Sequence, residues 1–299
     1  MICQNARHYQ GIPFGRGIII DASMETINSK ATLFMTTYAI GSVKGNYQSL
    51  LKLLEKIQFD PENDCLWFTG NLVNEGPESL AVLRFVKDLG KKAVMVLGNQ
   101  ELHLLALAEG FAQSAAGHTL DEILKAPDRD ELLKWLRKRA FIHHDAKLNF
   151  TLVHAGIPAE WTFSQALTFA YEVESVLSQG NYRALLEQRG QDQSRWHAKL
   201  TGWKRLRFIT NAYTLMKYCN GQGKLDFHAS GALGTQDESL VPWYRLPDRM
   251  TANLNVIFAD DANFEDVAIP GIYPLPTQGN LSALKLTETP EKISVACAA

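Results

Sequence analysis

The run Ala93-Val94-Met95-Val96-Leu97-Gly98 has five consecutive apolar residues and ends in a glycine. Two earlier runs, at 37–41 and 65–70, have a similar form, and each run is followed by apolar residues at helical spacing. A strand, a glycine-containing loop and a helix therefore occur three times in succession, which predicts an α/β fold. In such sheets the loops at the carboxyl ends of the strands build the functional site. We therefore expect the functional residues in these three glycine loops.

The composition excludes some classes of partner. The chain has 299 residues, and its hydrophobic fraction of 46% is enough for a sizeable core. Its 30 Lys and Arg residues and 32 Asp and Glu residues give a formal charge of −2. A dedicated nucleic-acid binder has a strongly basic face, so we expect no nucleic-acid partner. No apolar run reaches the roughly 18 residues of a membrane span, so we expect no membrane partner.

The four cysteines, Cys3, Cys65, Cys219 and Cys297, are far apart in the chain. Their spacing matches neither a disulfide framework nor a metal knuckle. Scattered, reduced thiols are typical of a cytosolic protein, because disulfides form in oxidising compartments. We therefore expect a cytoplasmic location.

Residues 1–34 differ from the rest of the chain. They contain several glycines and a polar stretch but no long periodic segment, so we expect a disordered extension there. We expect residues 35–299 to form the folded domain. The C-terminal part of this domain has strand-like runs without a helical pattern, which favours a second sheet or half-sheet. We interpret His143-His144-Asp145 as a solvated turn.

The polar loops resemble the signature of a known family. Their sequences, in chain order, are Gly41-Ser42-Val43-Lys44-Gly45, Gly70-Asn71-Leu72-Val73, Gly98-Asn99-Gln100-Glu101 and Val153-His154-Ala155-Gly156. This order and spacing resemble the metallophosphoesterases, and 205–213 resembles their symmetrical bis(5′-nucleosyl)-tetraphosphatase branch. The resemblance covers roughly residues 35–286.

The resemblance implies a fold and an activity. The implied fold is an α/β metallophosphoesterase-like sandwich of two sheets, flanked by helices and carrying a helical insertion. Members of the family use two divalent metals (manganese, cobalt or magnesium) and split diadenosine tetraphosphate into two ADP.

Several positions depart from the family's pattern. Ser42 and Lys44 stand where the family has its first Asp and its first His, and Asn71 stands where it has the Asp that bridges the two metals. Gln100 replaces the His that would protonate the leaving group. A glutamine side chain does not act as an acid or a base at any useful pH. The resemblance therefore leaves no intact catalytic set.

Three residues remain as candidate metal ligands: Asn99, His154 and Asp260, the last standing where the family has a His. Two closely spaced dications repel one another and require anionic oxygen ligands, whereas the ammonium group of Lys44 has no lone pair to offer. We therefore expect no tightly bound metal and a catalytically dead or very weak pseudoenzyme. Asn99 also has a structural interpretation, as a cap of the helix that follows.

Lys44, Arg207 and Asn211 are the candidate substrate-binding residues. One hypothesis is that Lys44 replaces part of the metal charge and holds a phosphate or an adenine nucleotide; the other is that it is merely solvated. Arg207 belongs to a basic, aromatic stretch that ends at Lys217, and it contacts either a polyphosphate or a carboxylate of another segment. Glu75 replaces an Arg of the family, which opposes binding of a tetra-anion.

Two other functions stay open. An active hydrolase could have rebuilt its site around a single metal held by Asn71, Asn99, His154 and Asp260, although amides are weak neutral ligands. Alternatively, the fold is a scaffold without enzymatic activity, with a protein partner that the sequence does not identify. Metal content and hydrolysis of diadenosine tetraphosphate separate these hypotheses.

Overall fold

The computed structural model describes residues 35–113, 118–187, 195–229, 231, 234–260, 269–276 and 278–297. The chain divides into two units, Met1–Leu33 and Phe34–Ala299, and the following description concerns the second. The extension expected at 1–34 lies outside the described residues. Among the described helices, none is both long and apolar enough to cross a membrane.

The first sheet contains the three predicted strands, with two strands from the C-terminal part of the chain beside them. From one edge to the other, its order is β12 (Glu291–Ala296), β11 (Asn280–Lys285), β1 (Thr37–Ile40), β2 (Cys65–Phe68) and β3 (Ala93–Met95). β1, β2 and β3 are parallel, whereas β11 is antiparallel to both β1 and β12. The parallel part places the carboxyl ends of three strands at one edge.

The second sheet packs against the first. Its order is β10 (Ile272–Pro276), β9 (Asn255–Asp260), β5 (Phe150–Val153) and β4 (Ile142–Asp145). A small third sheet, which the sequence did not predict, has the order β7 (Leu225–Asp226), β6 (Tyr218–Asn220) and β8 (Leu240–Pro242). The C-terminal strands therefore contribute to both large sheets rather than forming a sheet of their own.

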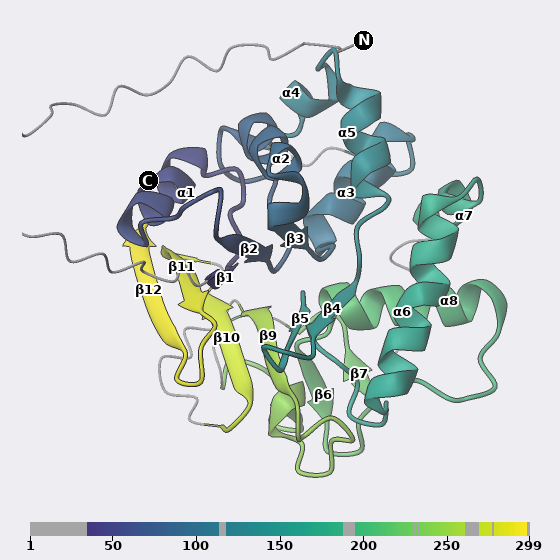
Figure 1. The fold of residues 1–299 in the computed structure, drawn as a ribbon. Helices are drawn as coiled ribbons and strands as arrows, with labels where there is room; N and C mark the ends of the chain where they lie inside the picture. The colour runs from purple at the N-terminus through teal and green to yellow at the C-terminus, as the bar shows by residue number, and fades with distance from the viewer. Residues whose placement is uncertain are drawn as a thin grey trace, which may run out of the picture. The chain divides into compact units, whose positions relative to one another are not determined.

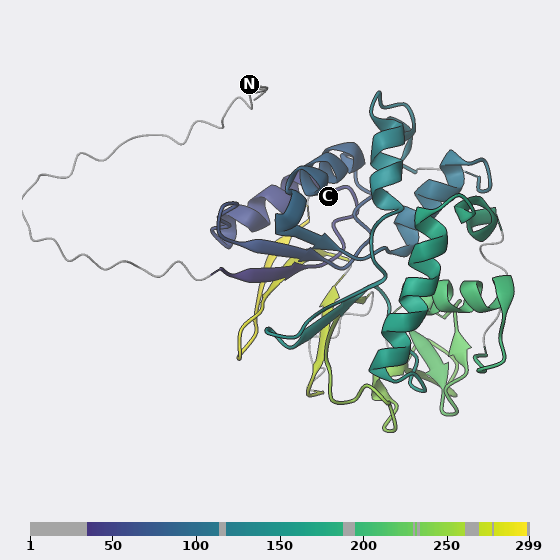
Figure 2. The same ribbon diagram turned by 45° about the vertical axis from the view of Figure 1, so that its right-hand side comes forward.

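Helices cover the outer faces of the two sheets (Figures 1 and 2). Those that follow the parallel strands are α1 (Tyr47–Lys56), α2 (Ser79–Asp88) and α3 (Asn99–Ala108). The remaining helices are α4 (Asp121–Leu124), α5 (Arg129–Leu136), α6 (Phe163–Ser178), α7 (Tyr182–Glu187) and α8 (Gly202–Leu215). The last three lie between β5 and β9 in the sequence. The predicted two-sheet sandwich with flanking and inserted helices is confirmed.

The alternation of side chains along the strands explains the sandwich. In β1, Tyr38 and Ile40 join the core under the helices, whereas Ala39 joins the core between the two sheets. Trp67 of β2 and Leu152 of β5 meet in that same inter-sheet core. Because successive side chains of a strand point to opposite faces, both faces of β1 can be apolar and buried.

The interpretation of His143-His144-Asp145 as a solvated turn is wrong. These residues belong to β4, which pairs with β5, and both imidazoles are half-buried. The His143 ring meets Trp67 edge to face at 4.6 Å, and a ring nitrogen of His144 lies 3.0 Å from the Thr151 hydroxyl. Cross-strand packing outweighs the polarity of the segment.

Candidate functional site

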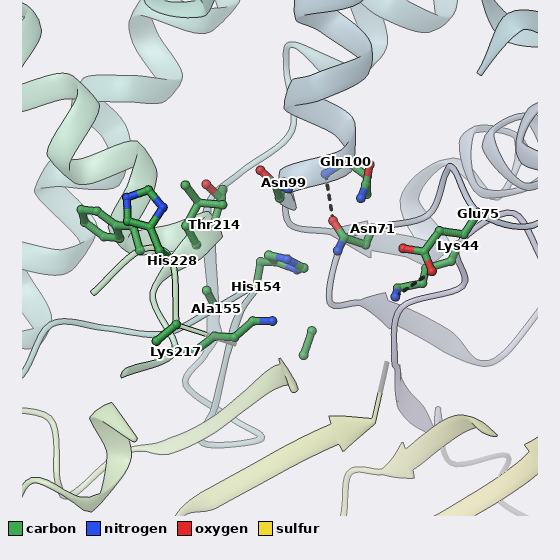
Figure 3. Close-up of a pocket in the computed structure, with 14 residues that line it drawn as sticks. Lys44, Asn71, Glu75, Asn99, Gln100, His154, Ala155, Thr214, Lys217 and His228 are labelled. Carbon is green, nitrogen blue, oxygen red and sulfur yellow. Dashed lines mark hydrogen bonds and ion pairs between the residues drawn. The ribbon is translucent and has the colours of Figure 1, made fainter. Parts of the chain in front are cut away.

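The loops that follow β1, β2, β3 and β5 meet at a cavity of about 230 Å³. Five candidate residues from the sequence line it: Lys44, Asn71, Asn99, Gln100 and His154 (Figure 3). The meeting point follows from the topology, because the carboxyl ends of neighbouring parallel strands lie at the same edge of a sheet.

Four non-glycine residues of these loops adopt left-handed backbone conformations: Lys44, Asn71, Asn74 and Glu75, with φ of 50°, 51°, 72° and 67°. Such conformations cost free energy and persist only where the surroundings impose them. Here two loops hold one another: the Lys44 N–H donates to the Asn71 carbonyl at 2.8 Å, and the Gly45 N–H donates to the Leu72 carbonyl at 2.7 Å. The loops are therefore built as one rigid unit.

A buried carboxylate, which the sequence analysis did not single out, ties this unit to α3. Glu101 is fully buried and accepts three backbone hydrogen bonds, from Gly98 at 2.9 Å, Asn71 at 2.9 Å and Leu72 at 2.7 Å. Burial raises the pKa of the Glu101 carboxyl, while the three N–H donors favour its charged form. One side chain thus satisfies otherwise orphaned donors of two loops.

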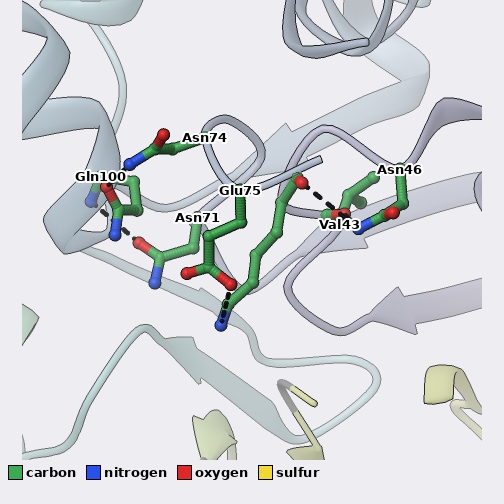
Figure 4. A network of polar contacts seen from close by, with 7 residues as sticks. Val43, Asn46, Asn71, Asn74, Glu75 and Gln100 are labelled. Carbon is green, nitrogen blue, oxygen red and sulfur yellow. Dashed lines mark hydrogen bonds and ion pairs between the residues drawn. The ribbon is translucent and has the colours of Figure 1, made fainter. Parts of the chain in front are cut away.

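Neutral amides occupy the positions where the resemblance predicts acidic or basic groups. The Asn71 Oδ1 accepts from the backbone N–H of Gln100 at 3.0 Å, and the Asn74 Nδ2 donates to the Gln100 Oε1 at 3.0 Å (Figure 4). Asn71 therefore bonds the first turn of α3. Asn99 is the first residue of that helix rather than its cap.

Lys44 forms an ion pair with Glu75, with 2.9 Å between Nζ and Oε2 (Figure 3). The Lys44 side chain is only 11% exposed, whereas that of Glu75 is 52% exposed. The hypothesis that Lys44 is merely solvated is therefore wrong. The two departures from the family pattern, Lys for His and Glu for Arg, contact one another.

A second lysine, Lys217, enters the cavity opposite Lys44 (Figure 3). Burial lowers the pKa of Lys217, the nearby Asp260 opposes that shift, and the charge of Lys44 adds to it. The sequence analysis noted Lys217 only as the end of a basic stretch. Its position between α8 and β6 directs it into the cavity, and no local sequence pattern signals this.

His154 is buried and neutral. Its Nδ1 lies 2.6 Å from the Thr69 carbonyl oxygen, which can only accept, so Nδ1 carries the proton and Nε2 has a lone pair. Burial lowers the pKa of His154 to about 4, and the charges of Lys217 and Lys44 also lower it. The imidazole is therefore a hydrogen-bond acceptor toward the cavity at neutral pH.

The remaining candidate residues do not line this cavity. Ser42 is buried beside it, and its hydroxyl has no hydrogen-bond partner among the described residues. Arg207 and Asn211 are buried on α8, and the neighbouring Arg205 forms the salt bridge to Glu172 at 2.7 Å. Asp260 lines a separate, much smaller cavity with Lys217.

Comparisons with known proteins identify the family. A family model described as calcineurin-like phosphoesterase matches residues 35–222. A symmetrical bis(5′-nucleosyl)-tetraphosphatase from Methylococcus capsulatus is 46% identical over 266 residues, which cover 87% of this chain and 95% of the relative. The chain belongs to the symmetrical bis(5′-nucleosyl)-tetraphosphatase family of calcineurin-like phosphoesterases.

A second relative and a solved structure agree with this family and with its fold. The Pseudomonas fluorescens relative is 42% identical over 269 residues, covering 88% of this chain and 95% of the relative. A solved structure of a protein assigned as a diadenosine tetraphosphatase superposes with a TM-score of 0.59 at 20% identity, covering 89% of this chain and 96% of that one. At that identity the superposition shows the fold alone.

The donors that line the cavity do not fit a pair of dications. Within the described part of the chain, no group of three His, Cys, Asp or Glu residues is arranged to hold a metal ion. Two ammonium groups, from Lys44 and Lys217, face the cavity instead. An ammonium group repels a dication and has no lone pair to donate to it.

We predict that Glu101→Gln lowers the free energy of unfolding by about 2–4 kcal/mol, because the amide places an N–H₂ group against backbone donors that the carboxylate satisfies. Urea unfolding measures this change. The control is Glu131→Gln, which breaks the exposed pair with Lys87 (2.7 Å) and is expected to cost less than about 1 kcal/mol. Equal effects of the two substitutions would contradict the role assigned to Glu101.

We predict that the neutral state of His154 makes stability fall in acid. The pKa of this group is lower in the folded chain (about 4) than in the unfolded chain (6.5), so below pH 6.5 the unfolded chain binds a proton that the folded chain does not. Stability is complete above pH 6.5 and declines by up to about 3 kcal/mol as the pH falls toward 4. Unfolding curves of the wild type and of His154→Gln, measured between pH 4 and pH 6.5, isolate the contribution of His154 to the free energy of unfolding, because the variant lacks the titrating group. Parallel pH profiles would refute it.

Proposed function

We propose that this member of the tetraphosphatase family binds phosphate esters of the adenine-nucleotide type and has lost the family's two-metal hydrolysis, or keeps only a trace of it. The observation that carries the proposal is the pair of lysines, Lys44 and Lys217, whose side chains enter one cavity from opposite sides (Figure 3). One of them stands where the family has a metal-binding His.

The electrostatics of the cavity favour an anion. The charge of Lys44 lowers the pKa of Lys217, so the two ammonium groups repel one another, and this repulsion is strong in a partly buried site. A phosphate between them removes the repulsion and accepts charge-assisted hydrogen bonds. A dication would meet the same two ammonium groups, whose charge the single carboxylate of Glu75 offsets only in part.

The loss of the family's proton donor also supports this proposal. Gln100 cannot protonate a leaving group, and its side chain accepts a hydrogen bond from Asn74. His154 has a pKa of about 4 and carries its single proton on the nitrogen that faces Thr69. Neither side chain offers an acid to the cavity at neutral pH.

A second candidate function is hydrolysis around a single metal, and the state of His154 favours it. A metal-binding imidazole usually donates its other N–H to a carbonyl or carboxylate, as His154 does to Thr69. The remaining candidates for such a site are weak, because Asn71 and Asn99 are neutral amides and Asp260 lines a different cavity. We therefore rank this function below anion binding.

Turnover of diadenosine tetraphosphate tests the first proposal. With manganese, cobalt or magnesium present, we expect ADP release at least a thousandfold below the roughly 10 s⁻¹ of a typical enzyme. Release approaching an ordinary turnover number would overturn the proposal. As a positive control on the scaffold, activity should rise in the chain that carries Ser42→Asp, Lys44→His, Asn71→Asp, Gln100→His and Asp260→His.

Metal binding tests the second candidate. In equilibrium dialysis against millimolar manganese, we expect less than one ion per chain, because two ammonium groups and neutral amides offer little affinity for a dication. His154→Gln serves as the matched variant, since it removes the imidazole from the four candidate ligands of this site. One stoichiometric ion that is lost in this variant would favour the single-metal hydrolase.

A further inference from the structure

A second, larger cavity adjoins the site. Its volume is about 710 Å³, and neutral polar side chains such as Asn46, Gln48 and Gln278 line much of it. Lys44 and Glu75 line both this cavity and the smaller one. The Lys44–Glu75 ion pair therefore lies on the boundary between the two cavities.

The two members of this ion pair are held very differently. Lys44 is nearly buried, and hydrogen bonds fix its backbone. Its N–H donates to the Asn71 carbonyl at 2.8 Å, and its carbonyl accepts from the Gly76 N–H at 2.7 Å. The Glu75 side chain is half-exposed. An ion pair with one exposed partner is weak, equivalent to no more than about fivefold in an equilibrium constant. A stronger anion can therefore displace the Glu75 carboxylate from Lys44 without moving the lysine.

We propose that the two cavities are compartments of one groove for a nucleoside phosphate, and that Glu75 closes the boundary between them in the free protein. A phosphate group takes the place of the Glu75 carboxylate on Lys44, and the nucleoside lies in the larger compartment. This proposal rests on the proposed anion-binding function, and it adds where the nucleoside part of the ligand binds.

The charges that line the groove determine which end of the ligand lies in which compartment. The smaller compartment contains Lys217, whereas the larger one contains Glu78, whose carboxylate accepts from the backbone N–H and the side chain of Gln48 at 3.3 and 3.0 Å. A phosphate chain is attracted to the first and repelled by the second. The larger compartment therefore suits an uncharged, hydrogen-bonding group, and its volume is in the range of small-molecule sites.

Calorimetric titration with pyrophosphate, ADP and adenosine tests the role of Glu75. In Glu75→Gln, the affinities for pyrophosphate and ADP should rise by up to about fivefold, because the competing carboxylate is gone, while the affinity for adenosine should not change. Glu131→Gln is the matched control, since it breaks a comparable ion pair with Lys87 away from the groove. Unchanged or weaker binding of pyrophosphate and ADP by Glu75→Gln would overturn the proposal.

Thiol alkylation tests the larger compartment, because Cys297 lines it and is partly exposed. ADP should slow alkylation of Cys297, as measured by mass spectrometry, more than pyrophosphate does, because pyrophosphate fills only the smaller compartment. Cys65, partly exposed and not among the residues that line either cavity, is the internal control. Equal labelling of Cys297 with and without ADP would overturn the proposal.

The two tests separate this inference from the proposed function. If pyrophosphate and ADP both fail to bind the wild-type chain and Glu75→Gln, anion binding itself is wrong. If pyrophosphate binds but ADP neither binds more tightly nor protects Cys297, the smaller site holds a phosphate and the shared groove is wrong.

Discussion

The arrangement of the site depends on one buried carboxylate. Glu101 accepts hydrogen bonds from the loop after β2 and from the residue before α3, so it fixes the distance between them. The loop after β2 in turn bonds the backbone of Lys44 and Gly45. A fully buried carboxylate is tolerated because three N–H groups replace water around it. Without it, those donors would be buried and unsatisfied.

The departures from the family pattern form a coherent set of contacts. Lys44 and Glu75 stand in place of a His and an Arg, and they neutralise one another. Asn71 and Gln100 stand in place of an Asp and a His, and they belong to one network of amides with Asn74. Each of these four groups has a partner that matches its charge or its hydrogen-bonding capacity, whereas the hydroxyl of Ser42 has none among the described residues. The loops therefore remain well bonded with these residues in place.

Much of the fold follows from the sequence, because short continuous apolar runs and strand-end glycines are local signals. These signals placed β1, β2 and β3 and predicted that Lys44, Asn71 and Gln100 would meet. Residues whose role depends on distant contacts were missed. Nothing near Glu101 in the sequence indicates that it bonds a loop some 30 residues earlier.

The positions of Lys217 and β4 were missed for the same reason. Lys217 reaches the cavity through the path of α8 and β6, and β4 is polar in sequence but ordered by Trp67 and Thr151. Arg207 and Asn211 lie in a segment that strongly resembles the family, and both are buried on α8 without lining the cavity of about 230 Å³. Similarity of a segment identifies the family without stating which side chains face the solvent-accessible site.

The left-handed residues around the cavity have a consequence for recognition. Hydrogen bonds between the loops and to Glu101 hold Lys44 and Asn71 in these conformations, so the protein itself fixes the shape of the loops. Little backbone freedom remains to be lost on association, and the entropic penalty falls mainly on the few side chains that must turn aside. A preformed site of this kind selects its ligands by shape and charge, and single side-chain substitutions can change its selectivity.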